Sequence, residues 1–341
     1  KKKTKQTMDI LHCNDEYNLV AKCNYNLVNN TENIFFQKLK KNYSNNSIQS
    51  IDFEDYSINY NNISYTLPIT NIKFLPKSFY RTDDTNRLLM SSSTTLDVLH
   101  FNEDTKSLNN ILNLTFSKTN NTNKFLLPPI TSFDFNLNNC TDVIQSCIDT
   151  TCSVYDLSKQ KIKSQLIAHD DLVLDVKYLN NNNVKKNAEL FMTSGKDGSL
   201  RLFDLRVLDH SSILYEDSQK NPLTNIEINP LDSNKILCFS TNDQITFIDL
   251  RYEKNPIKKY NLHSKISSCL WMDNGLDFLV GDQNNMITHW NINSLKTSHF
   301  PDNFFSDNKN NGIYKMKYFK EDNLIYYMDK DNKIEVVPFT S

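Results

Sequence analysis

Three side chains near the middle of the chain have the types that serine hydrolases use: His169, Ser194 and Asp197. In such enzymes a carboxylate orients an imidazole that takes the proton of an exposed serine hydroxyl, beside an oxyanion hole. The chain contains no Gly-x-Ser-x-Gly elbow to expose a nucleophile. A half-buried histidine that donates to a carboxylate fits the pattern better. We therefore predict no catalytic residue and assign these side chains, together with Asp204, to a structural polar chain.

Two tripeptides place an arginine two residues after an aspartate: Asp204-Leu-Arg206 and Asp249-Leu-Arg251. Arginine is a planar, bidentate donor that suits the carboxylates of a partner protein, although a salt bridge within the chain uses the same residue types. Phe304 and Phe305 offer an aromatic anchor for a bound peptide, unless they pack onto the protein itself. Arg206, Arg251 and the two phenylalanines are the candidate partner contacts.

Other kinds of chemistry are poorly represented in the sequence. There is no zinc-type Cys/His spacing, no His-Glu-x-x-His and, with five glycines, no glycine-rich phosphate loop. We predict neither metal nor cofactor. Seven cysteines without a Cys-x-x-Cys pair indicate reduced thiols. A net charge of −2 argues against direct binding to nucleic acid or a membrane surface, and no apolar run approaches the roughly 18 residues of a spanning helix.

The elements that carry these residues are predicted to be short strands. A chain of 341 residues suggests two domains, unless it is built from repeats. Runs rich in β-branched and aromatic residues, separated by Asn, Asp and Ser, favour an all-β protein. The 48 asparagines, with the aspartates, can form the turns that so few glycines cannot supply.

One unit recurs along the chain. Its clearest copy, Ser-Gly-Lys-Asp-Gly-Ser-Leu-Arg-Leu-Phe-Asp at 194–204, is a strand end, a tight turn and a strand that closes on an aromatic and a polar residue. Equivalent ends fall at positions 54, 102, 156, 204, 249, 291 and 338, which are 42 to 54 residues apart. Four strands at this period are typical of a blade of the WD-repeat β-propeller. For the fourth copy we predict strands at 173–179, 189–194, 199–206 and 211–217.

We therefore predict one seven-bladed propeller over residues 8–341, preceded by a basic tail at 1–7. The last copy has room for three strands, at 313–320, 323–329 and 333–340. The first strand of the first copy is predicted at 18–26. The upstream strand 8–14 would then supply the fourth strand of the last blade and close the ring, which leaves only short, protected edges.

Residues 128–217 carry a closer resemblance. The stretches Pro-Pro-Ile-Thr-Ser-Phe-Asp-Phe-Asn at 128–136, Gln-Leu-Ile-Ala-His-Asp at 165–170 and Gly-Lys-Asp-Gly-Ser-Leu-Arg-Leu-Phe-Asp-Leu-Arg at 195–206 resemble one WD-repeat family. It contains the plant transparent-testa-glabra regulator and its animal counterpart, a cullin-4 associated factor and a scaffold for dual-specificity tyrosine-regulated (DYRK) and homeodomain-interacting kinases. Tyr155 and Phe203 stand where tryptophan is commonest, and residues 180–187 enlarge a loop. The first hundred residues match only in strand order.

The resemblance implies a fungal member that works as a monomeric, non-catalytic scaffold in the cytoplasm and nucleus. Its partners would be a DYRK-type protein kinase and transcription regulators. An alternative is a substrate receptor of a cullin-4 ubiquitin ligase, whose adaptor Arg206 and Arg251 would contact. A remote alternative is a propeller hydrolase, which would need carboxylates or metal ligands at the central channel.

Overall fold

The computed structural model describes residues 7–26, 31–44, 47–60, 67–79, 86–114, 127–180, 189–252, 256–262, 264–293, 297–299 and 312–339. The chain divides into two compact units. The first unit comprises Lys1–Leu127 with Lys317–Ser341, and the second unit comprises Pro128–Met316. Among the residues described, the helical element is the short η1 (Lys77–Phe79), and no helix is long and apolar enough to cross a bilayer.

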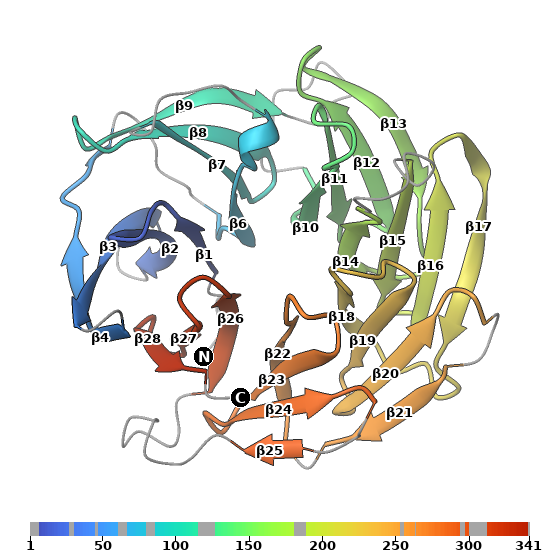
Figure 1. The fold of residues 1–341 in the computed structure, drawn as a ribbon. Helices are drawn as coiled ribbons and strands as arrows, with labels where there is room; N and C mark the ends of the chain where they lie inside the picture. Colours follow the sequence, from blue (N-terminus) through green and yellow to red (C-terminus); the bar gives the residue numbers. More distant parts are fainter. Residues whose placement is uncertain are drawn as a thin grey trace. The chain divides into compact units, whose positions relative to one another are not determined.

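The second unit contains four sheets of four strands, each antiparallel and in chain order (Figure 1). We number the sheets as blades along the chain. Blade 3 has β10 (Ile130–Phe135), β11 (Asp142–Cys147), β12 (Thr151–Asp156) and β13 (Lys161–Ile167). Blade 4 has β14 (Val173–Tyr178), β15 (Leu190–Gly195), β16 (Ser199–Asp204) and β17 (Val207–Glu216). Blade 5 has β18 (Leu223–Ile228), β19 (Lys235–Ser240), β20 (Gln244–Asp249) and β21 (Lys258–Asn261). Blade 6 has β22 (Ile266–Trp271), β23 (Asp277–Asp282), β24 (Ile287–Asn291) and β25 (Thr297–His299).

The first unit contains two further complete sheets and most of the last one. Blade 1 has β1 (Met8–His12), β2 (Tyr17–Asn26), β3 (Thr31–Ser44) and β4 (Ser47–Asp55). Blade 2 has β6 (Asn71–Phe74), β7 (Asn86–Ser92), β8 (Leu96–Asn102) and β9 (Ser107–Leu114), and β5 (Asn59–Tyr60) pairs parallel to its outer strand β9. Blade 7 has β26 (Ile313–Phe319), β27 (Leu324–Asp329) and β28 (Ile334–Pro338). The predicted fold class, an all-β propeller of seven blades, is confirmed.

The predicted role of strand 8–14 is wrong. β1 pairs with β2 in blade 1, and blade 7 has three strands within the described residues. The reason is local, because the Asn14 side chain accepts hydrogen bonds from the backbone N–H groups of Glu16 and Tyr17, at 3.0 and 2.9 Å, and folds a tight hairpin. Blade 7 meets blade 1 through side chains instead, including a buried ion pair of 2.8 Å between Lys41 and Asp322.

The same hairpin shifts the predicted strands of the first blade by one. Residues 18–26 form its second strand rather than its first, and the Phe53-Glu54 pair lies on its fourth strand β4 rather than on its third. The remaining six strand ends, from residue 102 to residue 338, lie on the third strand of their sheets as predicted.

The residue before the polar end of the third strand is a core position in blades 2 to 7. It is aromatic in blades 2, 3, 4 and 6 (Phe101, Tyr155, Phe203 and Trp290) and aliphatic in blades 5 and 7 (Ile248 and Val337). In blade 4, Phe203 is 3 % exposed and stacks on Phe191 of β15 with ring centroids 5.1 Å apart. Both rings belong to a cluster with Val154 of blade 3 and Val176 of β14. Truncation of such a buried ring costs about 3–5 kcal/mol, so the recurring aromatic is explained by packing.

Aspartates on the inner strands tie consecutive blades together. The Asp134 carboxylate on β10 accepts the backbone N–H of Tyr178 on β14 at 2.9 Å. One blade further on, Asp175 on β14 accepts the N–H of Ile226 on β18 at 3.0 Å. Because a carboxylate bonded to a buried N–H is a strong acceptor, each pair fixes one inner strand against the next.

Candidate functional site

One end of blade 4 holds a buried polar network centred on His169, which lies in the loop between β13 and β14. The His169 side chain is 1 % exposed. Its loop is held by the Thr150 carbonyl, which accepts the N–H groups of Ala168 at 2.8 Å and of His169 at 3.4 Å. Gly195 lies directly against the ring, where a Cβ would collide with the imidazole. A glycine is therefore required at position 195, because the His169 ring approaches its backbone closely.

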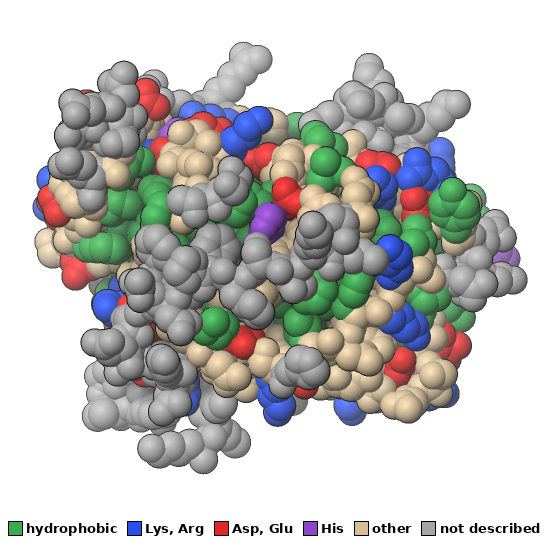
Figure 2. All heavy atoms as spheres, turned by 60° about the horizontal axis from the view of Figure 1, so that its bottom comes forward, with side chains coloured by type: hydrophobic (Ala, Val, Ile, Leu, Met, Phe, Trp, Pro, Cys, Tyr) green, Lys and Arg blue, Asp and Glu red, His purple; other side chains and the backbone are tan. Residues whose placement is uncertain are grey.

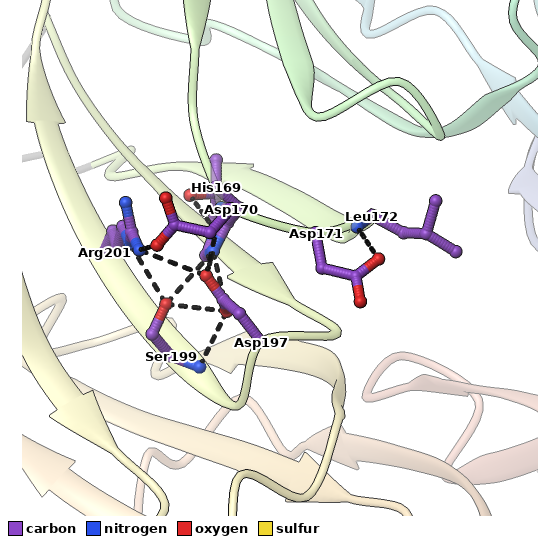
Figure 3. Close-up of polar contacts among 8 residues, drawn as sticks. His169, Asp170, Asp171, Leu172, Asp197, Ser199 and Arg201 are labelled. Carbon is purple, nitrogen blue, oxygen red and sulfur yellow. Dashed lines mark hydrogen bonds and ion pairs between the residues drawn. The ribbon is translucent and has the colours of Figure 1, made fainter.

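The imidazole is satisfied at both nitrogens. Its Nδ1 lies 3.0 Å from both carboxylate oxygens of Asp197, and its Nε2 lies 2.8 Å from Oγ1 of Thr193. Because a carboxylate only accepts, Nδ1 donates to Asp197 and Nε2 accepts the threonine hydroxyl. The Ser199 hydroxyl donates to the same carboxylate at 2.8 Å. Figure 3 shows His169, Asp197 and Ser199 converging in this way.

Arg201 and Asp170 extend the network to the surface (Figure 3). The Arg201 guanidinium donates to Ser199 Oγ at 3.0 Å, to Asp197 at 3.1 Å and to Asp170 at 2.7 Å. The Asp170 side chain is 86 % exposed although it is held by this bond. The Asp170 carboxylate thus faces solvent in an orientation that the buried network fixes through Arg201.

Burial sets the charge state of the network. Burial lowers the pKa of His169 more than the neighbouring Asp197 carboxylate raises it, so the ring is neutral at neutral pH. Burial by itself would raise the pKa of Asp197, but hydrogen bonds from Ser199 and the interaction with His169 hold that pKa below its ordinary value. Asp197 is therefore charged and paired with Arg201.

The arrangement supports the blade and does not present a nucleophile. Ser199 shares the Nδ1 side of the ring with Asp197, whereas a general base takes its proton at the other nitrogen. The hydroxyl at that other nitrogen belongs to Thr193, whose side chain is 0 % exposed and cannot be reached by a substrate. Within the described residues no group of three or more His, Cys, Asp or Glu side chains could hold a metal ion.

Two members of the predicted polar chain lie elsewhere. The strand hydroxyl that binds His169 comes from Thr193 rather than Ser194, whose buried Oγ has no hydrogen-bond partner among the described residues. Neighbouring residues of a strand point to opposite faces, so a prediction that is one residue off selects the wrong side. Asp204 lies at the far end of the six-residue β16 and pairs with Arg206 instead.

The two Asp-x-Arg tripeptides form similar pairs at the other end of blades 4 and 5. Arg206 donates from Nε and Nη2 to both oxygens of Asp204, at 2.8 and 2.6 Å, and its side chain is 56 % exposed. Arg251 makes the same contacts with Asp249 and also reaches Asp232 at 3.1 Å, with 54 % of its side chain exposed. These arginines lower the pKa of Asp204 and of Asp249. Both guanidinium groups are thus charged, oriented and accessible.

Exposed apolar side chains adjoin Arg251 or the residues that lead to it: Tyr252 follows Arg251, Leu231 precedes the Asp232 that Arg251 binds, and Leu276 follows the Gly275 that Leu231 packs against. Leu231 and Tyr252 are each 66 % exposed, and Leu276 is 42 % exposed. Leu231 packs against Gly275, with its Cβ 3.1 Å from the place of a Cβ there. Figure 2 shows that hydrophobic side chains also reach the surface between charged ones on one face. Neither leucine is predictable from the sequence, because Asn-Pro-Leu-Asp at 229–232 and Asn-Gly-Leu-Asp at 274–277 indicate only turns.

Phe304 and Phe305, the aromatic pair proposed as a peptide anchor, lie outside the described residues.

The seven sheets, the aromatic strand ends and the His–Asp network of blade 4 define a β-propeller of the WD-repeat class. No protein-family model matches the chain. It is 31 % identical over 261 residues to a WD repeat-containing protein of Saccharomyces cerevisiae, covering 67 % of this chain and 48 % of the relative. It is 34 % identical over 145 residues to the DDB1- and CUL4-associated factor 7 homolog of Dictyostelium discoideum, covering 42 % and 43 %.

A third relative, an uncharacterized WD repeat-containing protein of Schizosaccharomyces pombe, is 48 % identical over 88 residues, which are 26 % of this chain and 19 % of the relative. The chain spans about half, or less, of the length of these relatives. Among solved structures, Chaetomium thermophilum Raptor covers 100 % of this chain with 28 % of its own length, at a TM-score of 0.66 and 14 % identity. This likeness concerns the fold alone, whereas the sequence matches make WD-repeat proteins homologues of the chain.

Proposed function

We propose that the chain is a non-catalytic protein-interaction scaffold of the cytoplasm and nucleus. The observation that carries this proposal is the pair of oriented, exposed guanidinium groups at Arg206 and Arg251, each more than half exposed at one end of blades 4 and 5. Arginine held in one orientation loses little freedom when it binds a carboxylate, so it suits a recurring contact with a partner protein. The exposed leucines near Arg251 add apolar contact area.

One candidate partner is the adaptor of a cullin-4 ubiquitin ligase. It is favoured by the two Asp-x-Arg pairs and by the name of the Dictyostelium relative, a DDB1- and CUL4-associated factor homolog. The test is binding of purified DDB1-type adaptor to wild type and to the double variant Arg206→Glu/Arg251→Glu. We expect the double variant to lose adaptor binding.

The matched control is Lys196→Glu, which reverses another half-exposed cation that is paired with an aspartate, Asp171, at the other end of blade 4. The control should bind the adaptor like the wild type. Equal binding by the double variant and the wild type would contradict the adaptor proposal.

A second candidate partner is a DYRK-type kinase, alone or with transcription regulators. It is supported by the resemblance of residues 128–217 to the kinase-binding scaffold family. A pull-down with the recombinant kinase should recover a complex that survives Arg206→Glu/Arg251→Glu. If affinity purification from the source cells followed by mass spectrometry recovers neither such a kinase nor the adaptor, the proposed partners are wrong.

A further inference from the structure

Two isoleucines reach the surface at the end of blade 3 that adjoins His169. Ile167, the last residue of β13, is 77 % exposed, and Ile148, in the turn between β11 and β12, is 39 % exposed. Their backbones belong to one hydrogen-bonded framework, because Ile167 pairs with Thr151 and the Ile148 N–H donates to the Pro129 carbonyl at 3.1 Å. β-Branched side chains on a fixed backbone have few rotamers to lose when they bind.

Carboxylates adjoin both isoleucines in the sequence. Asp149 directly follows Ile148 and is exposed, and its Oδ1 accepts the N–H and hydroxyl of Thr151. Asp170 and Asp171 begin three residues after Ile167, in the loop that Figure 3 shows beside the polar network.

The charges at this end of the two blades do not balance. Among the described residues at this end, Asp149, Asp170, Asp171, Asp197, Glu216 and Asp217 are countered by Lys196, Arg201 and Lys220, and the remaining charge is negative. Arg201 donates hydrogen bonds to the buried Ser199 and Asp197 and to the exposed Asp170. A surface of this kind attracts cations and repels nucleic acid and anionic lipid.

We propose that Ile148, Asp149, Ile167, Asp170 and Asp171 form a docking surface for a basic segment of a partner protein. Apolar side chains of the segment pack on the two isoleucines, and its lysines or arginines pair with Asp149 and Asp170. The inference rests on the proposed scaffold function and adds a second binding surface. That surface lies at the opposite end of blade 4 from Arg206, because β16 separates Ser199 from Asp204.

The test uses a fluorescein-labelled synthetic peptide with two leucines among lysines and arginines, and fluorescence anisotropy at low salt. We expect the wild type to bind it, and Ile167→Ser and Asp170→Ala each to weaken binding about tenfold. Binding should also weaken as salt is added. A peptide with glutamates in place of the basic residues should not bind.

Ile213→Ser is the matched control, since Ile213 is a 50 % exposed isoleucine on the outer strand β17 of blade 4. It should bind the basic peptide like the wild type. The proposal is overturned if the wild type does not bind, if both variants bind as tightly as the wild type, or if Ile167→Ser converts a dimer into a monomer in sedimentation. Arg206→Glu/Arg251→Glu should keep peptide binding, so the two surfaces can fail separately.

Discussion

Blade 4 joins aspartate to arginine at both of its ends, and the two pairs differ in burial. At the His169 end, Asp197 and Arg201 are 13 % and 17 % exposed and are joined to a buried histidine and two hydroxyl groups. At the other end, Asp204 and Arg206 are 29 % and 56 % exposed and bind one another. The same residue types therefore stabilise the fold where water is excluded and remain available to a partner where it is not.

The largest difference between the ends should appear when His169 is removed. His169→Ala leaves Thr193 and Asp197 without their buried partner, which we expect to lower the free energy of unfolding by about 2–4 kcal/mol. Urea denaturation followed by circular dichroism measures this change. His210→Ala, at an exposed position of β17, is the matched control and should change little. Similar losses for both variants would contradict a supporting role for the network.

Acid should weaken the His169 end through the histidine. The folded pKa of His169 lies below its unfolded value of about 6.5, because burial disfavours the charged ring. Between the two values the unfolded state binds more protons, so the free energy of unfolding falls as the pH drops below about 6.5. Denaturation curves of wild type and His169→Gln, recorded from pH 7.5 to 5.5, should show a shallower pH dependence in the variant. An unchanged dependence would assign the effect to other groups.

The turn that holds the histidine loop carries strain that a substitution can relieve. Thr150 has a φ of 74°, a left-handed conformation that is unfavourable for a β-branched residue. Thr150→Gly should raise the free energy of unfolding by about 0.5–1 kcal/mol and keep the carbonyl that binds Ala168 and His169. Thermal denaturation checks this. A lower melting temperature would show that the threonine side chain contributes more than the strain costs.

The exposed pairs should respond least. Arg206→Ala removes one exposed ion pair and should leave the melting temperature unchanged. Arg251→Ala leaves the Asp249 side chain, which is only 4 % exposed, without its ion-pair partner and should lower the melting temperature measurably. Differential scanning fluorimetry of the two variants side by side makes the comparison. Equal shifts would mean that the burial of Asp249 does not matter.

Sequence reasoning succeeded where a repeat unit restricts the backbone most. The glycine at 195, the Asp-Gly turn and the aromatic at 203 located the four strands of blade 4 to within a few residues. It failed in blade 1, where a hairpin formed by the Asn14 side chain has no counterpart in the repeat. Ser194 was predicted in place of Thr193 as the partner of His169, because the residue types alone do not determine which face of a strand a side chain takes.

Left-handed turn positions are occupied by asparagine and aspartate, as predicted, but also by other residue types. Asp243 and Asn285 adopt positive φ angles of 63° and 65°, as expected of residues that tolerate this conformation. Lys106 and Gln160 do so as well, at 51° and 53°. The exposure of Ile167 and Leu231 was not predictable either, since it depends on which neighbouring elements cover a side chain.

The carboxylates that join inner strands also bear on how the second unit unfolds. If β14 unfolded alone, Asp134 would lose the N–H of Tyr178, and the amide of Ile226 would lose Asp175. Each lost hydrogen bond destabilises a neighbouring blade that is still folded, so the unfolding of a single blade is unfavourable. Blades 3 to 5 should therefore open together, with the amide hydrogens of Tyr178 and Ile226 exchanging at one common, slow rate.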